Sequence, residues 1–415
     1  MEIGENDSDN GNDNKKKKEG LFSFTRLNKY FIIPFICPII CMISNYFLSL
    51  MMDQSDFDDK QFFLTTFVNM SFVGGGLMYF VSWIRNKTDE TRDNAIVYKE
   101  RQNTSQIKFI YNDNSIKFPT FTIFFILLLI SICLAIFNLV DIYSLDRNVF
   151  EERLYFLFFI SFFSKIILKI DIFSHQVLSL FIGSIGLILL FIPIALIIEK
   201  EDIIINICMF FASIAFSLFL VLIKYLTHYY FISPFLCILS AGAISVILNT
   251  IGFMIYSLIK NGDLSIIKEN FEFKNITNKT KLIGYSIITF VSASILQMLS
   301  NLVVYYFTPT LLMVTDCISP MLLWLFLTMP NEDSKINIIF NICGYIISLF
   351  SSLIYNEIII FNFCDFNKNT KKYIEERQRE ELISLKDTEN KINNSNLTQN
   401  ENENENDTSV DEEND

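Results

Sequence analysis

Long, uninterrupted blocks of apolar residues constrain this 415-residue sequence more than any other feature. Apolar residues make up 51% of the chain, and they run in blocks rather than along one periodic face. A run of about 18 or more apolar residues is long enough, as a helix, to cross the hydrocarbon core of a bilayer. Helices satisfy their own backbone polar groups inside lipid. The blocks therefore predict an all-α, polytopic membrane protein whose first partner is the lipid bilayer.

Ten such segments are present, and each is expected to form a transmembrane helix. They are about Lys29–Met52, Gln61–Ile84, Phe118–Val140, Arg153–Ile170, Val177–Ile198, Ile203–Ile223, Phe231–Ile259, Leu282–Tyr306, Leu311–Met329 and Ile336–Phe363. The fourth carries Lys165 and Lys169 near its end, and their amines are expected to extend to the lipid headgroups.

The charges between the segments predict the orientation. Lys and Arg gather in the N-terminal stretch, in the loop from Arg85 to Lys117 and in the C-terminal stretch, which favours the cytosol for both termini. The expected organisation is a polar N-terminal tail (1–28), two five-helix groups (29–198 and 199–363), and a cytosolic amphipathic helix followed by a disordered, acidic, Asn-rich tail (364–415). The pattern suits the plasma membrane and internal membranes equally.

Asn275-Ile-Thr and Asn278-Lys-Thr lie in the loop expected on the side opposite the termini. Both match the acceptor pattern for N-glycosylation. A chance match is at least as common in a chain this rich in asparagine.

Polar side chains inside the apolar segments are the candidate binding residues, because polar groups in a bilayer turn inward or find partners. Gln297 and Asn301 share one face of the eighth segment, Ser245 and Asn249 share one face of the seventh, and Asn69 precedes a glycine triplet in the second. Close helix packing alone explains many such residues. Several inward amides together favour a water-containing cavity, since an amide is costly to bury.

Asp316 in "VTDCISP" is the strongest single candidate, because a carboxylate deep in a span usually faces a bundle interior or a water-filled cavity. Pro320, four residues on, has no N–H for the carbonyl of Asp316 and predicts a helix break there. A structural acid, protonated or paired with a buried amide, is the alternative. Glu357 is a possible second ionisable group near the end of the tenth segment.

Several kinds of chemistry have no support in the sequence. The chain has two histidines, no CxxC pair and no GxxxxGK[ST] phosphate-binding loop. No metal site, cofactor, nucleic-acid partner or enzymatic activity is therefore expected.

A faint internal repeat relates "GSIGLILLFI" (183–192) to "NICGYIISLF" (341–350) and makes Gly186 equivalent to Gly344. Five spans followed by five spans would give two halves of opposite orientation, an architecture in which transporters bind substrate at the midplane.

Three stretches resemble the drug/metabolite transporter superfamily, which includes nucleotide-sugar, triose-phosphate and chloroquine-resistance-type transporters and has members in protists. "YFTPTLLMVTDCISPMLLWLFL" looks like the ninth span of that family with Pro320, "FNICGYIISLFSSLIYNE" like the tenth with Gly344 and Tyr355, and "FFSKIILKIDIFSHQVLSLFIGSIG" like the junction of the fourth and fifth. The proline of the fourth span and a nucleotide-sugar motif near spans seven and eight are missing.

The resemblance implies ten spans, cytosolic termini, inverted repeats and alternating access without nucleotide hydrolysis. The leading hypothesis is a secondary transporter of a small organic solute, with Asp316 as the candidate carrier of a coupled proton or cation. The alternative is a non-transporting membrane scaffold or receptor that acts through its cytosolic tails.

Overall fold

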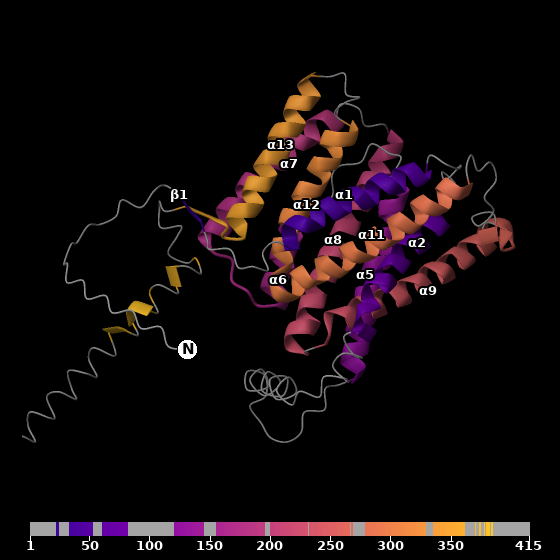
Figure 1. Ribbon diagram of the computed structural model, residues 1–415, viewed down its shortest axis with the longest axis horizontal. Coiled ribbons are helices and arrows are strands. Elements are labelled where there is room, and N and C mark those ends of the chain that lie inside the picture. Colours follow the sequence, from indigo (N-terminus) through magenta and orange to yellow (C-terminus); the bar gives the residue numbers. More distant parts are fainter. Residues whose placement is uncertain are drawn as a thin grey trace, which may run out of the picture. The chain divides into compact units, whose positions relative to one another are not determined.

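The computed structural model describes residues 22–24, 33–52, 60–81, 120–144, 155–195, 200–230, 232–265, 267–268, 279–328 and 335–361, and single residues between 370 and 384. The chain forms two compact units. One comprises Arg26–Asn356 and contains the membrane helices (Figure 1). The other combines Met1–Thr25 with Glu357–Asp415.

The helical unit consists of apolar helices joined by short turns and by segments outside the described residues. Its helices are α1 (Ile33–Met52), α2 (Gln61–Gly76), α5 (Thr120–Ser144), α6 (Phe156–Ile167), α7 (Ser174–Ala195), α8 (Lys200–Tyr229), α9 (Pro234–Asn261), α11 (Lys279–Tyr306), α12 (Pro309–Leu323) and α13 (Lys335–Tyr355). A π-helical turn, η3 (Trp324–Thr328), continues α12.

Nine of the described helices are long and apolar enough to cross a membrane, which confirms the expectation of an all-α, multi-pass membrane protein. The fourth expected span differs from the others. Its helix, α6, has 12 residues and would extend only about 18 Å, against a hydrocarbon core of about 30 Å. The helix ends because Lys169 adopts a left-handed backbone conformation with φ of 55° just beyond it.

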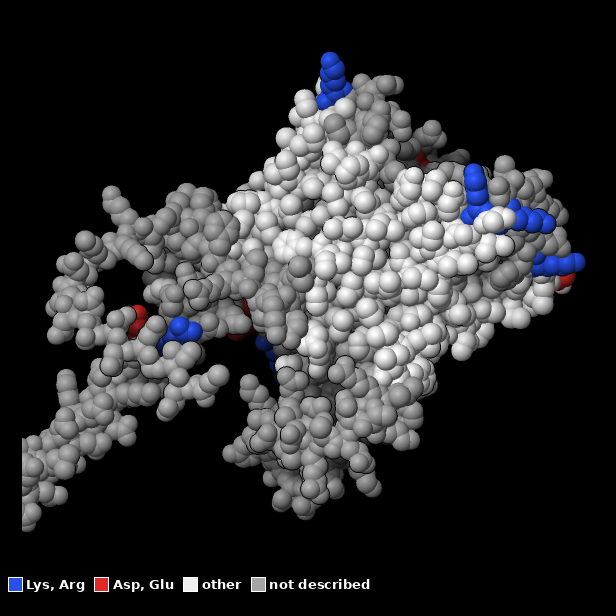
Figure 2. Space-filling view, in the orientation of Figure 1, with Lys and Arg blue, Asp and Glu red and all other residues white. Residues whose placement is uncertain are grey.

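The surface of the helical unit is apolar where lipid would cover it. Phe121, Phe181, Ile204, Phe211 and Ile259 are each exposed over more than 60% of their area. A soluble protein rarely presents so many large apolar side chains to solvent. In Figure 2 the face over the helices is white, and the blue Lys and Arg side chains stand at its edges.

Helix ends are set by local chemistry. The hydroxyl oxygen of Thr308 accepts a hydrogen bond from the N–H of Leu311 and so caps the start of α12. Pro309, at the first helical position, has a φ fixed near the helical value. Gly262 ends α9 with φ of 74°, the left-handed conformation that glycine adopts without steric cost.

The two ends of the helical unit can be identified from buried contacts. At one end, here called the Met51 end, Met51 of α1, Leu64 of α2, Ile142 of α5 and Leu282 of α11 form one apolar cluster. This cluster joins two helix C-termini to two helix N-termini. Helices α1 and α5 therefore run in the opposite direction to α2 and α11, as alternate membrane-crossing segments do.

At the opposite end, here called the Lys224 end, polar groups hold helix termini together. The hydroxyl of Tyr229, the last residue of α8, donates to the carbonyl of Leu168 after α6 at 3.1 Å. The Nζ of Lys224 donates to the carbonyl oxygens of Tyr305 (2.9 Å) and Phe307 (2.7 Å) at the end of α11. Each donor satisfies a carbonyl that has no partner within its own helix.

Helices α7 and α13 lie side by side in opposite directions (Figure 1). The hydroxyl of Ser179 donates to the carbonyl of Ser351 at 2.6 Å, and the hydroxyl of Ser351 donates back to the carbonyl of Ser179 at 2.7 Å. Farther along, Gly186 and Gly344 bring the two backbones into contact. Small and hydroxylated residues allow this close approach in lipid.

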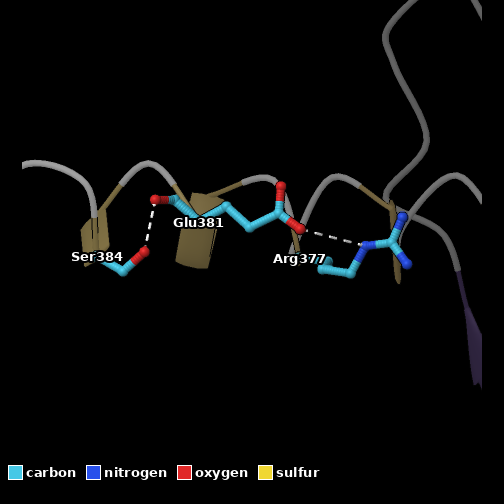
Figure 3. A network of polar contacts seen from close by, with 3 residues as sticks. All are labelled: Arg377, Glu381 and Ser384. Atoms are coloured by element: carbon cyan, nitrogen blue, oxygen red, sulfur yellow. Dashed lines mark hydrogen bonds and ion pairs between the residues drawn. The ribbon is translucent and has the colours of Figure 1, made fainter.

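The second unit is small in its described part. Strands β1 (Phe22–Phe24) and β2 (Ile359–Phe361) pair in antiparallel register, with Phe22 opposite Phe361. The described residues between 373 and 384 are helical, as the amphipathic pattern predicts. Arg377 lies 3.8 Å from the carboxylate of Glu381, whose carbonyl accepts the hydroxyl of Ser384 (Figure 3). Both charged side chains are more than half exposed, so this pair contributes little stability.

Candidate functional site

Asn69, like Ser245, is fully buried, with no exposed surface. Its side-chain oxygen accepts a 2.7 Å hydrogen bond from the amide of Asn138 on α5, which is itself buried. Sequence reasoning missed Asn138, although a lone asparagine in a strongly apolar segment was a usable signal. The Asn69 amide nitrogen has no hydrogen-bond partner among the described residues.

Two other candidates are satisfied by backbone carbonyls of neighbouring helices. The hydroxyl of Ser245 on α9 donates to the carbonyl of Ser131 on α5 at 2.9 Å. The amide of Asn301 on α11 donates to the carbonyl of Pro234, the first residue of α9, at 3.0 Å. Both bonds hold helices together, so the packing interpretation accounts for these two residues.

Asn249 and Gln297 lie on the helices that flank α2. Asn249 on α9 is buried, and its amide nitrogen makes no hydrogen bond within the described part of the chain. Gln297 on α11 is half-buried beside Gly75, where a Cβ would lie 3.4 Å from that of Gln297. The structure thus brings Asn69, Asn249 and Gln297 to three helices that pack on one another.

The backbone at Asp316 is helical, and its side chain lies outside the described residues. Helix α12 continues through Pro320 to Leu323, and its irregular backbone follows as the π-helical turn at Trp324. Next to Asp316, the thiol of Cys317 lies 3.2 Å from the hydroxyl of Ser352 on α13. Isolated π-helical turns are often found at functional sites.

The remaining candidates belong to the second unit or lie outside the described residues. Glu357 follows α13 by two residues, has a left-handed φ of 57° and belongs to the second unit. Asn275 and Asn278 lie outside the described residues, so glycosylation stays a prediction.

Sequence analysis also missed the role of Lys224. It lies inside α8, one turn before the helix ends, and its ammonium caps α11 as described above. The partial negative charge at a helix C-terminus favours a cation there. Asn356, which follows α13, contacts the start of α12 in a similar way. Its amide nitrogen donates to the carbonyl of Thr310 at 3.0 Å, and its side-chain oxygen accepts a hydrogen bond from the Thr310 hydroxyl at 3.1 Å. The connection between α11 and α12 is thereby held from α8 and from α13.

Among the residues that the structure describes, no group of three or more His, Cys, Asp or Glu side chains could hold a metal ion. Neither the family models nor the curated proteins compared with this sequence give a match. The apolar helices, their alternating directions and their lipid-facing surface establish a multi-pass membrane protein.

Proposed function

We propose that this chain is a secondary transporter that carries a small organic solute by alternating access, with the layout of the drug/metabolite transporter superfamily. The proposal adds a tenth crossing, made by α6, and places both termini in the cytosol. It involves no catalytic chemistry, and it assigns solute binding to side chains inside the helical unit.

The observation that carries the proposal is a correspondence between two groups of five helices. Let α1, α2, α5, α6 and α7 correspond in order to α8, α9, α11, α12 and α13. Under this assignment, three helix pairs of the structure each have an equivalent pair. The pair α1 and α11 is equivalent to α8 and α5, the pair α2 and α11 is equivalent to α9 and α5, and the pair α1 and α12 is equivalent to α8 and α6. Both members of each correspondence are packed together. This is the pattern that a two-fold relation between inverted repeats produces.

The helix pairs that would lie across such an axis, α2/α9 and α7/α13, are also closely packed. A Cβ at Gly186 would lie 3.1 Å from the carbonyl oxygen of Gly344, and a Cβ at Gly344 would lie 3.1 Å from that of Gly186. These are the two glycines that the sequence repeat makes equivalent. Their reciprocal contact supports an axis between α7 and α13.

The fourth helix of each group is the irregular one, which gives further support. Helix α6 has 12 residues, and α12 has 15, with Pro320 inside and a π-helical turn after it. The two helices also touch each other. Short or interrupted helices at corresponding positions of two halves are typical of the substrate region in transporters.

Uptake into proteoliposomes tests the proposal. The purified full chain should catalyse saturable uptake of at least one member of a panel of sugars, polyols, amino acids and organic acids. Asp316→Asn should lower uptake if Asp316 carries a coupled cation, whereas unchanged uptake would remove Asp316 from the mechanism. The scaffold hypothesis predicts no saturable uptake of any solute.

A cross-link between the two groups tests alternating access itself. Cysteines at Leu168 and Tyr229, joined by a short cleavable thiol cross-linker, should block uptake by holding α6 to α8 at the Lys224 end. The exposed Cys208 and Cys343 are first replaced by Ala. Cleavage should restore uptake, and Tyr229→Cys alone should be insensitive to the linker. Full uptake by the cross-linked protein would contradict rocking of the two groups about this contact.

A further inference from the structure

Four unpaired polar atoms lie on α2, α9 and α11 within about one helical turn of depth. Within the described residues, no hydrogen-bond partner is present for the hydroxyls of Thr66 and Thr289 or for the amide nitrogens of Asn69 and Asn249. These four residues are here called the polar layer. A buried donor or acceptor without a partner costs about 1–3 kcal/mol, and bilayer lipid supplies no substitute.

The register of α2 against α9 places Thr66 level with Asn249. The rings of Phe62 and Phe253 lie 4.7 Å apart. Thr66 follows Phe62 by four residues, and Asn249 precedes Phe253 by four. Because the two helices run in opposite directions, one turn from the ring contact leads to Thr66 on one helix and to Asn249 on the other.

The register of α2 against α11 adds Thr289 at the same depth. The rings of Phe67 and Phe290 lie 5.8 Å apart, and Thr66 and Thr289 immediately precede them. Asn69 lies one turn along α2 from Thr66 and is fixed by its bond from Asn138. The polar layer therefore includes residues of three packed helices within about one helical turn of depth.

The two threonines depart from the usual behaviour of hydroxyls in helices. Thr65 donates to the carbonyl of Gln61 and Thr250 to the carbonyl of Val246, each four residues earlier in its own helix. This local bond is the ordinary way for threonine to be satisfied in a helix. Thr66 and Thr289 make no such bond in the described structure, so the hydrogen-bonding capacity of their hydroxyls is unused there.

The layer is uncharged. Between Gln61 and Val81, α2 and its extension contain no Asp, Glu, Lys or Arg. The charged residues of α9 and α11 are Lys260, Lys279 and Lys281, all at helix ends. Asp141 of α5 lies one turn beyond Asn138 and makes interactions of its own.

We propose that the polar layer binds an uncharged solute with several hydroxyl or carbonyl oxygens, such as a sugar or polyol. The two amide nitrogens donate to its oxygens, and the two threonine hydroxyls donate or accept according to the solute. A charged solute is excluded because no side chain of opposite charge in the layer compensates its desolvation. The inference rests on the proposed transport function and names the substrate class for it.

Three solutes that share a six-carbon polyol chain and differ mainly in charge provide the test. Uptake of sorbitol (neutral), gluconate (anion) and N-methylglucamine (cation) is measured in proteoliposomes containing the full chain, with glucose and myo-inositol as further neutral probes. At least one neutral probe should show saturable uptake, and the two ions should be at least about tenfold slower, the effect of about 1.4 kcal/mol.

Matched variants of α9 locate the effect. Asn249→Leu removes the amide at similar volume and should lower neutral uptake about tenfold or more. Thr250→Val, at the next position, removes a hydroxyl satisfied within its own helix and should leave uptake unchanged. Asn249→Asp replaces the donor with an acceptor that can carry charge, and should shift preference toward N-methylglucamine. Thermal unfolding, followed by labelling of the buried Cys237, shows which variants fold.

The outcomes separate this inference from the proposed function. Saturable uptake of an ion with none for the neutral probes would refute the substrate class and leave transport standing. A stable Asn249→Leu variant with full neutral uptake would show that the layer holds only water and would refute the site. The absence of saturable uptake for every solute would refute both.

Discussion

The contact between α2 and α9 gives a prediction that can be worked out from single atoms. A Cβ added to Gly242 would lie 2.8 Å from the backbone nitrogen of Val73, 2.9 Å from the Cβ of Phe72 and 3.1 Å from the carbonyl oxygen of Asn69. Ordinary contacts begin near 3.4 Å. Gly242→Ala therefore forces α9 away from α2 by several tenths of an ångström, because two of these atoms belong to the backbone.

Gly252, on the same helix, is the matched control, because a Cβ there would meet nothing within 4 Å. Both substitutions change helix propensity equally, so the difference between them isolates the packing cost. Overpacking typically costs about 1–3 kcal/mol. Gly242→Ala should thus be less stable than Gly252→Ala by about that amount.

Unfolding in mixed micelles with rising SDS, read by labelling of the buried thiol of Cys237, measures the two free energies. Gly252→Ala should match the unmodified chain or exceed it. If Gly242→Ala is as stable as Gly252→Ala, the close approach of α2 and α9 is refuted, and with it the register on which the polar layer depends.

Three further substitutions test other contacts. Lys224→Met should lower the free energy of unfolding by about 1–2 kcal/mol, because it removes the cap of α11, while Lys224→Arg should keep part of that stability. Equal SDS midpoints for the two variants would argue against a charged cap. Ser351→Val removes the bond that the Ser351 hydroxyl donates to the carbonyl of Ser179 and should lower the free energy of unfolding by about 1–2 kcal/mol in the same titration, and an unchanged midpoint would deny this bond. Asn356→Leu should speed amide hydrogen exchange at the start of α12, near Thr310, and leave α5 unaffected; unaltered exchange at α12 would contradict the anchoring role.

The sequence predicts the long helices well, because hydropathy alone determines which segments enter lipid. The expected span Leu282–Tyr306 is Lys279–Tyr306 in the structure, and Phe231–Ile259 is Pro234–Asn261. Two segments are exceptions. The tenth was expected to reach Phe363, but α13 ends at Tyr355 and Ile359–Phe361 form strand β2. The fourth also differs. Its apolar stretch reaches Ile170, but a left-handed backbone at Lys169 ends the helix at Ile167, and hydropathy contains no information on backbone conformation.

The pairing of polar side chains was not predictable from spacing along one helix. Asn69 meets Asn138, 69 residues away, because of how α2 and α5 are rotated about their axes. Ser245 and Asn301 shared helical faces with other candidates, yet each bonds to a backbone carbonyl of a neighbouring helix. The expected sixth span ended at Ile223, just before Lys224, although a helix terminus can accept a cation inside the fold.

Close contacts on both sides of Thr66 and Asn249 explain how unpaired polar groups can persist between α2 and α9. At one end Gly242 lies against the α2 backbone, and at the other the rings of Phe62 and Phe253 are in contact. Both contacts fix the separation of the two helices at Thr66 and Asn249. If packing alone determined this interface, apolar side chains at those two positions would fill it at lower cost. A preorganised binding site instead requires polar groups that are held between two rigid contacts. The free energy needed to hold these groups in place is then supplied by folding and not by solute binding.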